Sequence, residues 1–234
     1  MLTLLAAAAL AAPPALAVTP ALPARAPDAL WAGTVAVLGE RKVPILGTVQ
    51  FRTDTNALAD VWRVDGGWLL SQRTCGVHFA RTAGAQLHLA EHAPAAMPLS
   101  TIHFVASGDQ WLAGPWPSGW NADDHDADGE AGITVNVKAP ICGKGELHVE
   151  SVATSAARGA PTTGVALAGD IKVRVIQTNH SAKGICLRLL PRETDETMIG
   201  RFAYRQVALG TTCEQVTTFP DPDPDAAKPV PIEL

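Results

Sequence analysis

Short runs of apolar and β-branched residues, separated by turn signals, recur along most of this chain. Residues 31–38, 58–64 and 172–177 are three such runs. The breaks between them include the charged residues 39–42 and residues 65–67, where two glycines can supply the positive φ of a tight hairpin. A turn about every ten residues is typical of an all-β protein. We therefore predict an antiparallel barrel or sandwich with many short strands.

Alternating side chains support this sheet, and segments that favour a helix are scarce. Residues 171–175 read Ile-Lys-Val-Arg-Val, which would place apolar groups in the core and basic groups in solvent. Residues 185–190 are predicted as a further strand. Only residues 83–97 have a helix-forming composition, and Pro94 would end a helix there. We expect one short helix at most, near residues 83–93.

The N-terminal segment has the features of a signal peptide. It is rich in Leu and Ala, and no charged side chain occurs before Arg25. The apolar run is too short to span a membrane, and it ends in Ala15-Leu16-Ala17, the small-x-small pattern that signal peptidase accepts. We predict that residues 1–17 are removed and that the chain is exported, to the periplasm or the medium.

Composition also marks the limits of the folded domain. Residues 18–29 are rich in Pro and Ala without periodicity, which is typical of a flexible leader. Residues 214–234 contain repeated Pro-Asp pairs that cannot join a sheet or a helix, so we expect an extended tail. A single β domain is predicted between them, over residues 30–213.

Four cysteines in a chain predicted to be exported indicate two disulfides. Three pairings are possible. We favour Cys142 with Cys186 and Cys75 with Cys213, because each would join strands of neighbouring hairpins. A structural zinc site built from the same four thiols is the alternative, and an oxidising compartment disfavours it.

The charge of the chain argues against nucleic acid as a partner. The formal net charge is −5, and the 18 Lys and Arg residues are scattered rather than gathered in a basic stripe. After the N-terminal run, no apolar segment of about 20 residues occurs, so no membrane-spanning helix is expected.

The most specific chemical motif is the sequence Asp-His-Asp-Ala-Asp-Gly at residues 124–129. Three carboxylates at alternate positions repel one another unless a cation lies between them, and the following glycine allows a sharp turn around that cation. The predicted calcium ligands are Asp124, Asp126, Asp128 and Glu130. The alternative is a hydrated acidic turn that binds no particular ion.

The motif departs from an EF-hand. Position 12 of such a loop is a bidentate Glu, and here it is Val135. The flanks are also wrong, because Pro115 and Pro117 precede the loop and a predicted strand follows it. We therefore expect a calcium loop that holds a hairpin of a β domain.

Several segments together carry a resemblance to a known group. They are Leu-Trp-Ala-Gly-Thr at residues 30–34, Lys-Val-Pro-Ile-Leu-Gly at residues 42–47, Cys75, and Asp126-x-Asp128-Gly129 followed by Gly-Ile-Thr-Val at residues 132–135. This arrangement resembles uncharacterised exported bacterial β-proteins that carry a D-x-D-x-D-G calcium-type loop, over most of residues 30–212. The resemblance implies export and a calcium loop, and it implies no activity.

Residues 88–92 spell H-x-x-E-H, a motif that on a helix places two histidines on one face for zinc, with the Glu as a general base. Here the residues are His88, Glu91 and His92. Pro94 would end such a helix, and no third ligand is marked. Exposed histidines at a strand edge are the better interpretation, and a zinc hydrolase is the least favoured function.

Trp111, Trp116 and Trp120 lie close together just before the acidic motif. Exposed tryptophans could stack on sugar rings beside a calcium ion, but rings that cap one end of the barrel and help to fix the loop are the better interpretation. We find no complete catalytic set in the sequence. We therefore expect a calcium-binding structural or surface-interaction protein without enzymatic activity, whose partner would be a glycan or a cell-surface protein. A calcium-assisted carbohydrate-binding protein is the alternative.

Overall fold

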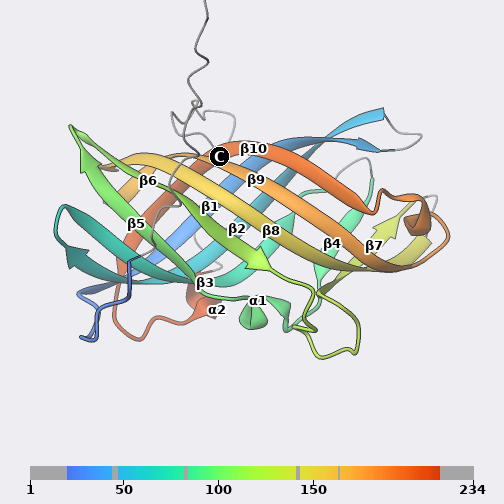
Figure 1. Cartoon of the computed structure of the whole chain (residues 1–234), viewed down its shortest axis with the longest axis horizontal. Helices are drawn as coiled ribbons and strands as arrows, with labels where there is room; N and C mark the ends of the chain where they lie inside the picture. The colour runs from blue at the N-terminus through green and yellow to red at the C-terminus, as the bar shows by residue number, and fades with distance from the viewer. Residues whose placement is uncertain (1–19, 44–46, 82–83, 141–142, 163, 217–234) are drawn as a thin grey trace, which may run out of the picture.

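The computed structural model describes residues 20–43, 47–81, 84–140, 143–162 and 164–216 (Figure 1). Its strands are β1 (Ala29–Val43), β2 (Gly47–Val64), β3 (Gly67–Phe79), β4 (Gln86–Leu89), β5 (Ser100–Ser107), β6 (Gln110–Trp120), β7 (Ile133–Ala139), β8 (Gly143–Thr162), β9 (Val165–Lys183) and β10 (Glu193–Val207). The helical segments are α1 (Ala93–Ala96), the 3₁₀ helix η1 (Leu187–Leu189) and α2 (Cys213–Val216).

The strands form one antiparallel sheet that closes on itself. Around the ring the order is β8, β6, β5, β3, β2, β1, β10 and β9, and β9 pairs again with β8. Neighbours in the ring are consecutive along the chain or separated only by β4 or β7, and β1 and β10, the first and last strands, close it, so the ring has the connectivity of an up-and-down barrel. The predicted all-β antiparallel fold is confirmed, and of the two architectures considered the chain forms the barrel.

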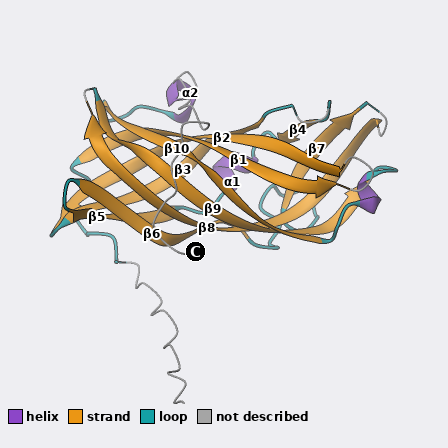
Figure 2. Ribbon diagram, turned by 90° about the horizontal axis from the view of Figure 1, so that it is seen from above, coloured by secondary structure: helices purple, strands orange, loops and turns teal. Residues whose placement is uncertain are grey.

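Two further strands, β7 and β4, extend this ring at one end. Trp120 at the end of β6 lies opposite Ser151, and Ile133 at the start of β7 lies opposite Val149. β6 and β7 therefore follow one another along the same edge of β8, and β4 pairs with β7 as β5 pairs with β6. In the view of Figure 2 these extensions lie at the end of the barrel opposite the β5–β6 hairpin.

Side chains fill the interior of the barrel, as expected when a ring of this size closes. The core contains many aromatic rings, and Trp68 and Trp111 stack with centroids 4.1 Å apart. Gly33 is needed here, because a Cβ atom would lie 2.4 Å from the Tyr204 ring. A smaller cluster, centred on Leu147 and Val149, continues the core under β7 and the adjoining part of β8.

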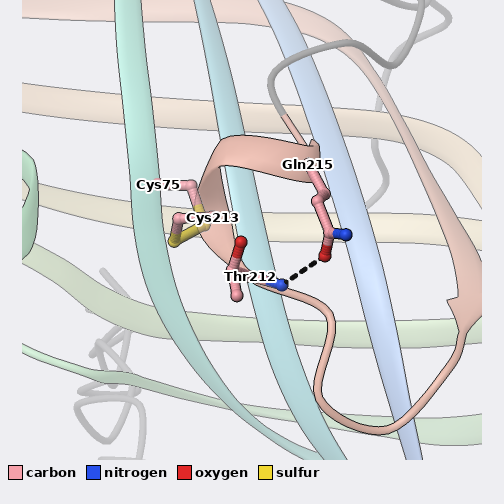
Figure 3. Close-up of a disulfide and its surroundings, with 4 residues drawn as sticks. All are labelled: Cys75, Thr212, Cys213 and Gln215. Atoms are coloured by element: carbon pink, nitrogen blue, oxygen red, sulfur yellow. Dashed lines mark hydrogen bonds between the residues drawn. A yellow bond between two sulfur atoms is a disulfide. The ribbon is translucent and has the colours of Figure 1, made fainter.

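The C-terminal helix α2 is held against the barrel by a disulfide. Cys75 of β3 is bonded to Cys213, and their Cα atoms lie 4.9 Å apart (Figure 3). The Thr212 N–H donates to the side chain of Gln215 at 2.9 Å, a capping interaction that favours a helix start. The predicted pairing of Cys75 with Cys213 is confirmed. Cys142 lies outside the described residues, so its pairing with Cys186 stays a prediction.

The strands are longer than predicted. The charged residues 39–42, expected as a turn, lie within the strand β1. A Cβ atom at Gly39 would meet Phe51 at 2.6 Å, so this glycine makes room for packing, and Arg41 continues the strand with an ion pair to Glu196. By contrast, residues 65–66 form the predicted tight turn between β2 and β3.

Helix positions also differ from the prediction. Residues 86–89 form the strand β4, and among the described residues of this segment the helix is α1, which begins at Ala93. Pro94 lies in the first turn of α1, where its missing N–H costs nothing, so it starts a helix rather than ending one. Residues 185–190, predicted as a strand, contain the 3₁₀ helix η1.

The segments at the two ends are only partly described. Residues 1–19 and 217–234 lie outside the described residues, and with them the predicted signal peptide and most of the predicted tail. The second half of the predicted leader is anchored to β2. Asp28 accepts a hydrogen bond from the Arg63 N–H at 2.7 Å, and Trp62 donates its indole N–H to the Arg25 carbonyl at 2.9 Å.

Candidate metal centre

The aspartate loop (residues 121–132) connects β6 to β7 (Figure 1), and it contacts Thr134 of β7 and His148 of β8. Its two ends are tied together, because the His125 N–H donates to the Gly132 carbonyl and the Gly132 N–H to the Asp123 carbonyl, both at 3.1 Å. Gly132 has φ +88°, and a Cβ atom there would lie 2.1 Å from the Val149 carbonyl oxygen. Only glycine fits where the loop rejoins the sheet.

The three aspartates predicted from the sequence converge in this loop. Asp124, Asp126 and Asp128 each bring one carboxylate oxygen within 4.8 Å of the others. The Asp124 carboxylate also accepts the N–H groups of Asp128 at 3.2 Å and Gly129 at 2.9 Å, which wraps the chain around it. Like charges this close repel by about 1 kcal/mol per pair even at the dielectric constant of water. The arrangement therefore could hold a cation.

Asp126 carries the clearest sign of such a ligand. Its Oδ2 atom accepts the Thr134 N–H at 2.8 Å. Its Oδ1 atom is buried and has no hydrogen-bond partner. Buried carboxylate oxygens are rarely left without a partner, because the lost hydration is costly. A cation at the centre of the loop would supply that partner.

Asp128 is held in its charged form. Its Oδ2 atom accepts the Thr134 hydroxyl at 2.5 Å, and its Oδ1 atom accepts the Glu130 N–H at 2.8 Å. The Thr134 hydroxyl contributes most to lowering the pKa of Asp128; burial opposes this, and the Glu130 N–H and the positive charge of Lys183 add to it. A lowered pKa keeps this carboxylate available to a cation at neutral pH.

Two polar residues of the motif turn away from the three aspartates. The Glu130 carboxylate lies 3.4 Å from the Lys183 ammonium and accepts the Ser181 hydroxyl at 3.3 Å, so it contacts β9. The His125 ring lies 2.7 Å from the Asn121 amide oxygen. Of the four ligands predicted from the sequence, three lie together, and the Glu130 side chain is engaged elsewhere.

His148 of β8 is a residue of this site that sequence reasoning missed. Its side chain is only 1% exposed, and its Nε2 atom lies 3.6 Å from the Asp128 Oδ2 atom without a hydrogen-bond partner. Strand alternation alone places His148 on the outer face of the sheet. It is buried because the aspartate loop covers it, and no signal within residues 146–152 indicates that.

The H-x-x-E-H residues do not form a zinc site. His88 lies in β4, whereas Glu91 and His92 lie in the turn before α1, so the single helix that the motif requires is absent. Among the described residues, the three aspartates are the one group of three or more acidic, His or Cys side chains close enough to share an ion. The geometry gives the zinc hydrolase no support.

The three tryptophans do not form an exposed platform. Trp116 is buried in the barrel core, and Trp111 stacks on Trp68 at the edge of that core. Trp120 packs on the smaller cluster, and its indole N–H donates to the Val149 carbonyl at 2.6 Å. These contacts favour the interpretation in which the three rings belong to the packing of the barrel over the sugar-binding alternative.

Comparisons with known protein families, with curated proteins and with solved structures gave no match to this chain. Within the part of the chain that the structure describes, no helix has the length and apolar character needed to cross a membrane.

Proposed function

We propose that this chain is an exported, non-catalytic β-barrel protein whose aspartate loop binds calcium, and that the ion serves a structural or surface-interaction role. The observation that carries the proposal is the buried Oδ1 atom of Asp126, which has no partner and belongs to a group of three converging carboxylates. The Cys75–Cys213 disulfide supports export, because such bonds persist in oxidising compartments.

Calcium is the cation that this ligand set favours. It takes six to eight oxygen ligands in flexible geometry, whereas magnesium demands a near-ideal octahedron. The three aspartates offer only oxygen, and water or loop carbonyls would complete the shell. Because the twelfth-position Glu of an EF-hand is replaced by Val135, we expect weak affinity, on the order of 10⁻⁴–10⁻³ M, as in extracellular calcium modules.

Bound calcium would hold the loop closed over the sheet. It neutralises the repulsion among the aspartates and keeps Asp126 and Asp128 on the Thr134 N–H and hydroxyl. The loop then stays packed over His148. This role needs no second substrate and no catalytic group.

Calorimetric titration and thermal unfolding in calcium and in chelator test the proposal. Calcium should bind with measurable heat and raise the melting temperature of the purified protein. In Asp126→Asn this rise should disappear, and the melting temperature in chelator should match that of the wild type or exceed it slightly, because one repelling charge is gone. Asp123→Asn is the matched control, since Asp123 lies in the loop but outside the three-aspartate group.

The proposal fails if titration of the wild type with calcium gives no heat of binding and calcium leaves its melting temperature unchanged. It also fails if Asp123→Asn and Asp126→Asn lose the calcium response equally, because the response would then reflect general surface charge.

A further inference from the structure

The hydrogen bonds around His148 indicate which ring nitrogen carries the proton. The Glu130 carboxylate can only accept, so the Ser181 hydroxyl donates to it at 3.3 Å. The Ser181 oxygen is then free to accept the Nδ1–H of His148, 2.5 Å away. In the neutral imidazole with this tautomer, Nε2 carries a lone pair.

That lone pair faces a carboxylate. The Nε2 atom of His148 lies 3.6 Å from the Oδ2 atom of Asp128, and nothing else in the described structure bonds to it. The His148 side chain is only 1% exposed and the Asp128 side chain 33% exposed, so a lone pair and a carboxylate oxygen facing each other here are unfavourable unless a positive charge, a proton or a metal ion, lies between them. Among the histidines that contact a carboxylate, His78 and His180 differ, because their side chains are partly open to solvent.

A transition-metal ion fits this pair better than calcium does. Zinc binds imidazole nitrogen and carboxylate oxygen at about 2.0–2.2 Å, so two such ligands at tetrahedral or octahedral angles lie about 3.0–3.5 Å apart. The observed 3.6 Å needs only a small movement. Calcium prefers oxygen ligands and would leave the nitrogen unused.

We propose that the aspartate loop has a second mode of coordination, in which His148 Nε2 and Asp128 Oδ2 bind a zinc-class transition-metal ion. The inference rests on the proposed function in that the loop is a cation site. Asp126, with an oxygen within 4.8 Å of one on Asp128, can supply a third ligand, and water the rest. Because Asp128 serves both modes, zinc and calcium exclude each other.

The surroundings of His148 have the form that metal-binding histidines require. Such a ring donates its second N–H to an acceptor that fixes its orientation. Here Ser181 is that acceptor, and Glu130, itself held by Lys183, orients Ser181. The role of Glu130 in this mode is thus to position the histidine through Ser181, and this explains why its carboxylate turns away from the three aspartates.

The test is a separate titration of the full-length oxidised protein with zinc and with calcium, followed by a competition between them. In His148→Gln, zinc affinity should fall by at least about tenfold while calcium binding persists. In Asp124→Asn the opposite should hold, because Asp124 belongs to the calcium group alone. Ser181→Ala should weaken zinc binding about 10–100-fold and leave calcium binding unchanged. His125→Gln is the matched control and should alter neither.

Calcium binding by His148→Gln also serves as the check that this variant is folded. If it does not fold, nitrogen NMR of the wild-type histidine rings replaces it, and zinc should shift one Nε2 resonance strongly. Equal zinc affinity in the wild type and His148→Gln, no displacement of calcium by zinc, or no shifted ring nitrogen would overturn the inference. A wild type that binds zinc through His148 but does not bind calcium would instead overturn the calcium proposal alone.

Discussion

Tyr204 carries a hydroxyl group into the closed interior of the barrel. Its side chain is buried among Trp31, Phe202 and the backbone of Gly33, and its hydroxyl donates to the side-chain oxygen of Gln72. Burial raises the pKa of Tyr204 above the ordinary value, because the charged phenolate would lose its hydration. Because this pKa is higher in the folded than in the unfolded state, the neutral phenol favours the folded state at pH values where the unfolded chain would ionise.

This position predicts a distinct response to alkaline pH. The stability contributed by Tyr204 is complete below the unfolded pKa of about 10 and is lost as the pH rises above it, because the unfolded chain ionises first. Tyr204 is the single tyrosine of the chain, so tyrosinate absorbance reports on it alone. That absorbance should appear only together with unfolding.

Tyr204→Phe is the control for this prediction. It should lower the free energy of unfolding by about 1–3 kcal/mol at neutral pH, because the Gln72 oxygen loses its donor. It should also remove the part of the loss of stability at alkaline pH that Tyr204 causes. Tyrosinate absorbance at pH near 10 in a protein that is still folded would contradict the burial of this ring.

At the scale of residues, sequence spacing predicts only what is local. Asp124, Asp126 and Asp128 converge because alternate residues of one tight loop lie close together, so the motif alone was enough to predict that they meet. His148 and Ser181 join the site from β8 and β9, and their approach depends on strand pairing and on a loop that folds over the sheet. Such contacts have no signature in the residues around them.

At the scale of elements, β6 and β7 act as one strand position interrupted by the aspartate loop. Opposite β8, only Glu150 separates the partner of Trp120 from the partner of Ile133. The loop is therefore an excursion from the sheet, and the register on either side does not depend on its length. The spacing of turns predicted many strands. It did not predict that residues 39–42 and the tryptophan-rich residues of β6 lie within strands, because packing rather than composition decides their conformation.

This arrangement predicts that the loop can be removed without loss of the barrel. Deleting residues 121–131 leaves Gly132 to join Trp120 to Ile133 opposite Glu150, with the register of β6 and β7 unchanged. The variant should keep the far-ultraviolet circular dichroism of a β-protein, and its melting temperature should be the same in calcium and in chelator.

A variant with Asn at positions 124, 126 and 128 keeps the loop and serves as the control for the deletion. It should also lose the calcium response while retaining the packing over His148. Loss of the β-sheet signal in the deletion variant alone would show that the loop helps to form the barrel.

At the scale of the whole molecule, the Cys75–Cys213 disulfide links the middle of the chain to its last described helix. The two cysteines are 138 residues apart in the sequence. Beneath α2, Val216 is fully buried against Leu30 and Leu58. The bond thus keeps a small apolar cluster covered on the outside of the barrel.

Removing this bond should cost much of the stability of the protein. On the chain-entropy account, a closed loop of this length contributes about 3–5 kcal/mol by restricting the unfolded chain. The double variant Cys75→Ser/Cys213→Ser should therefore unfold at a lower urea concentration than the oxidised wild type, with α2 detached. An unchanged unfolding midpoint would mean that packing of Val216 alone holds the helix.

The closure of the ring also determines when each strand can pair while the chain is being synthesised. β1 pairs with β2 on one side and with β10 on the other, so its second edge has no partner until residues 193–207 have been synthesised. The partner of Cys75 arrives later still. An unpaired strand edge can join to another chain, and pairings between distant residues form slowly. A growing copy of this protein therefore carries an open strand edge until β10 has been synthesised, and that edge must be protected until then.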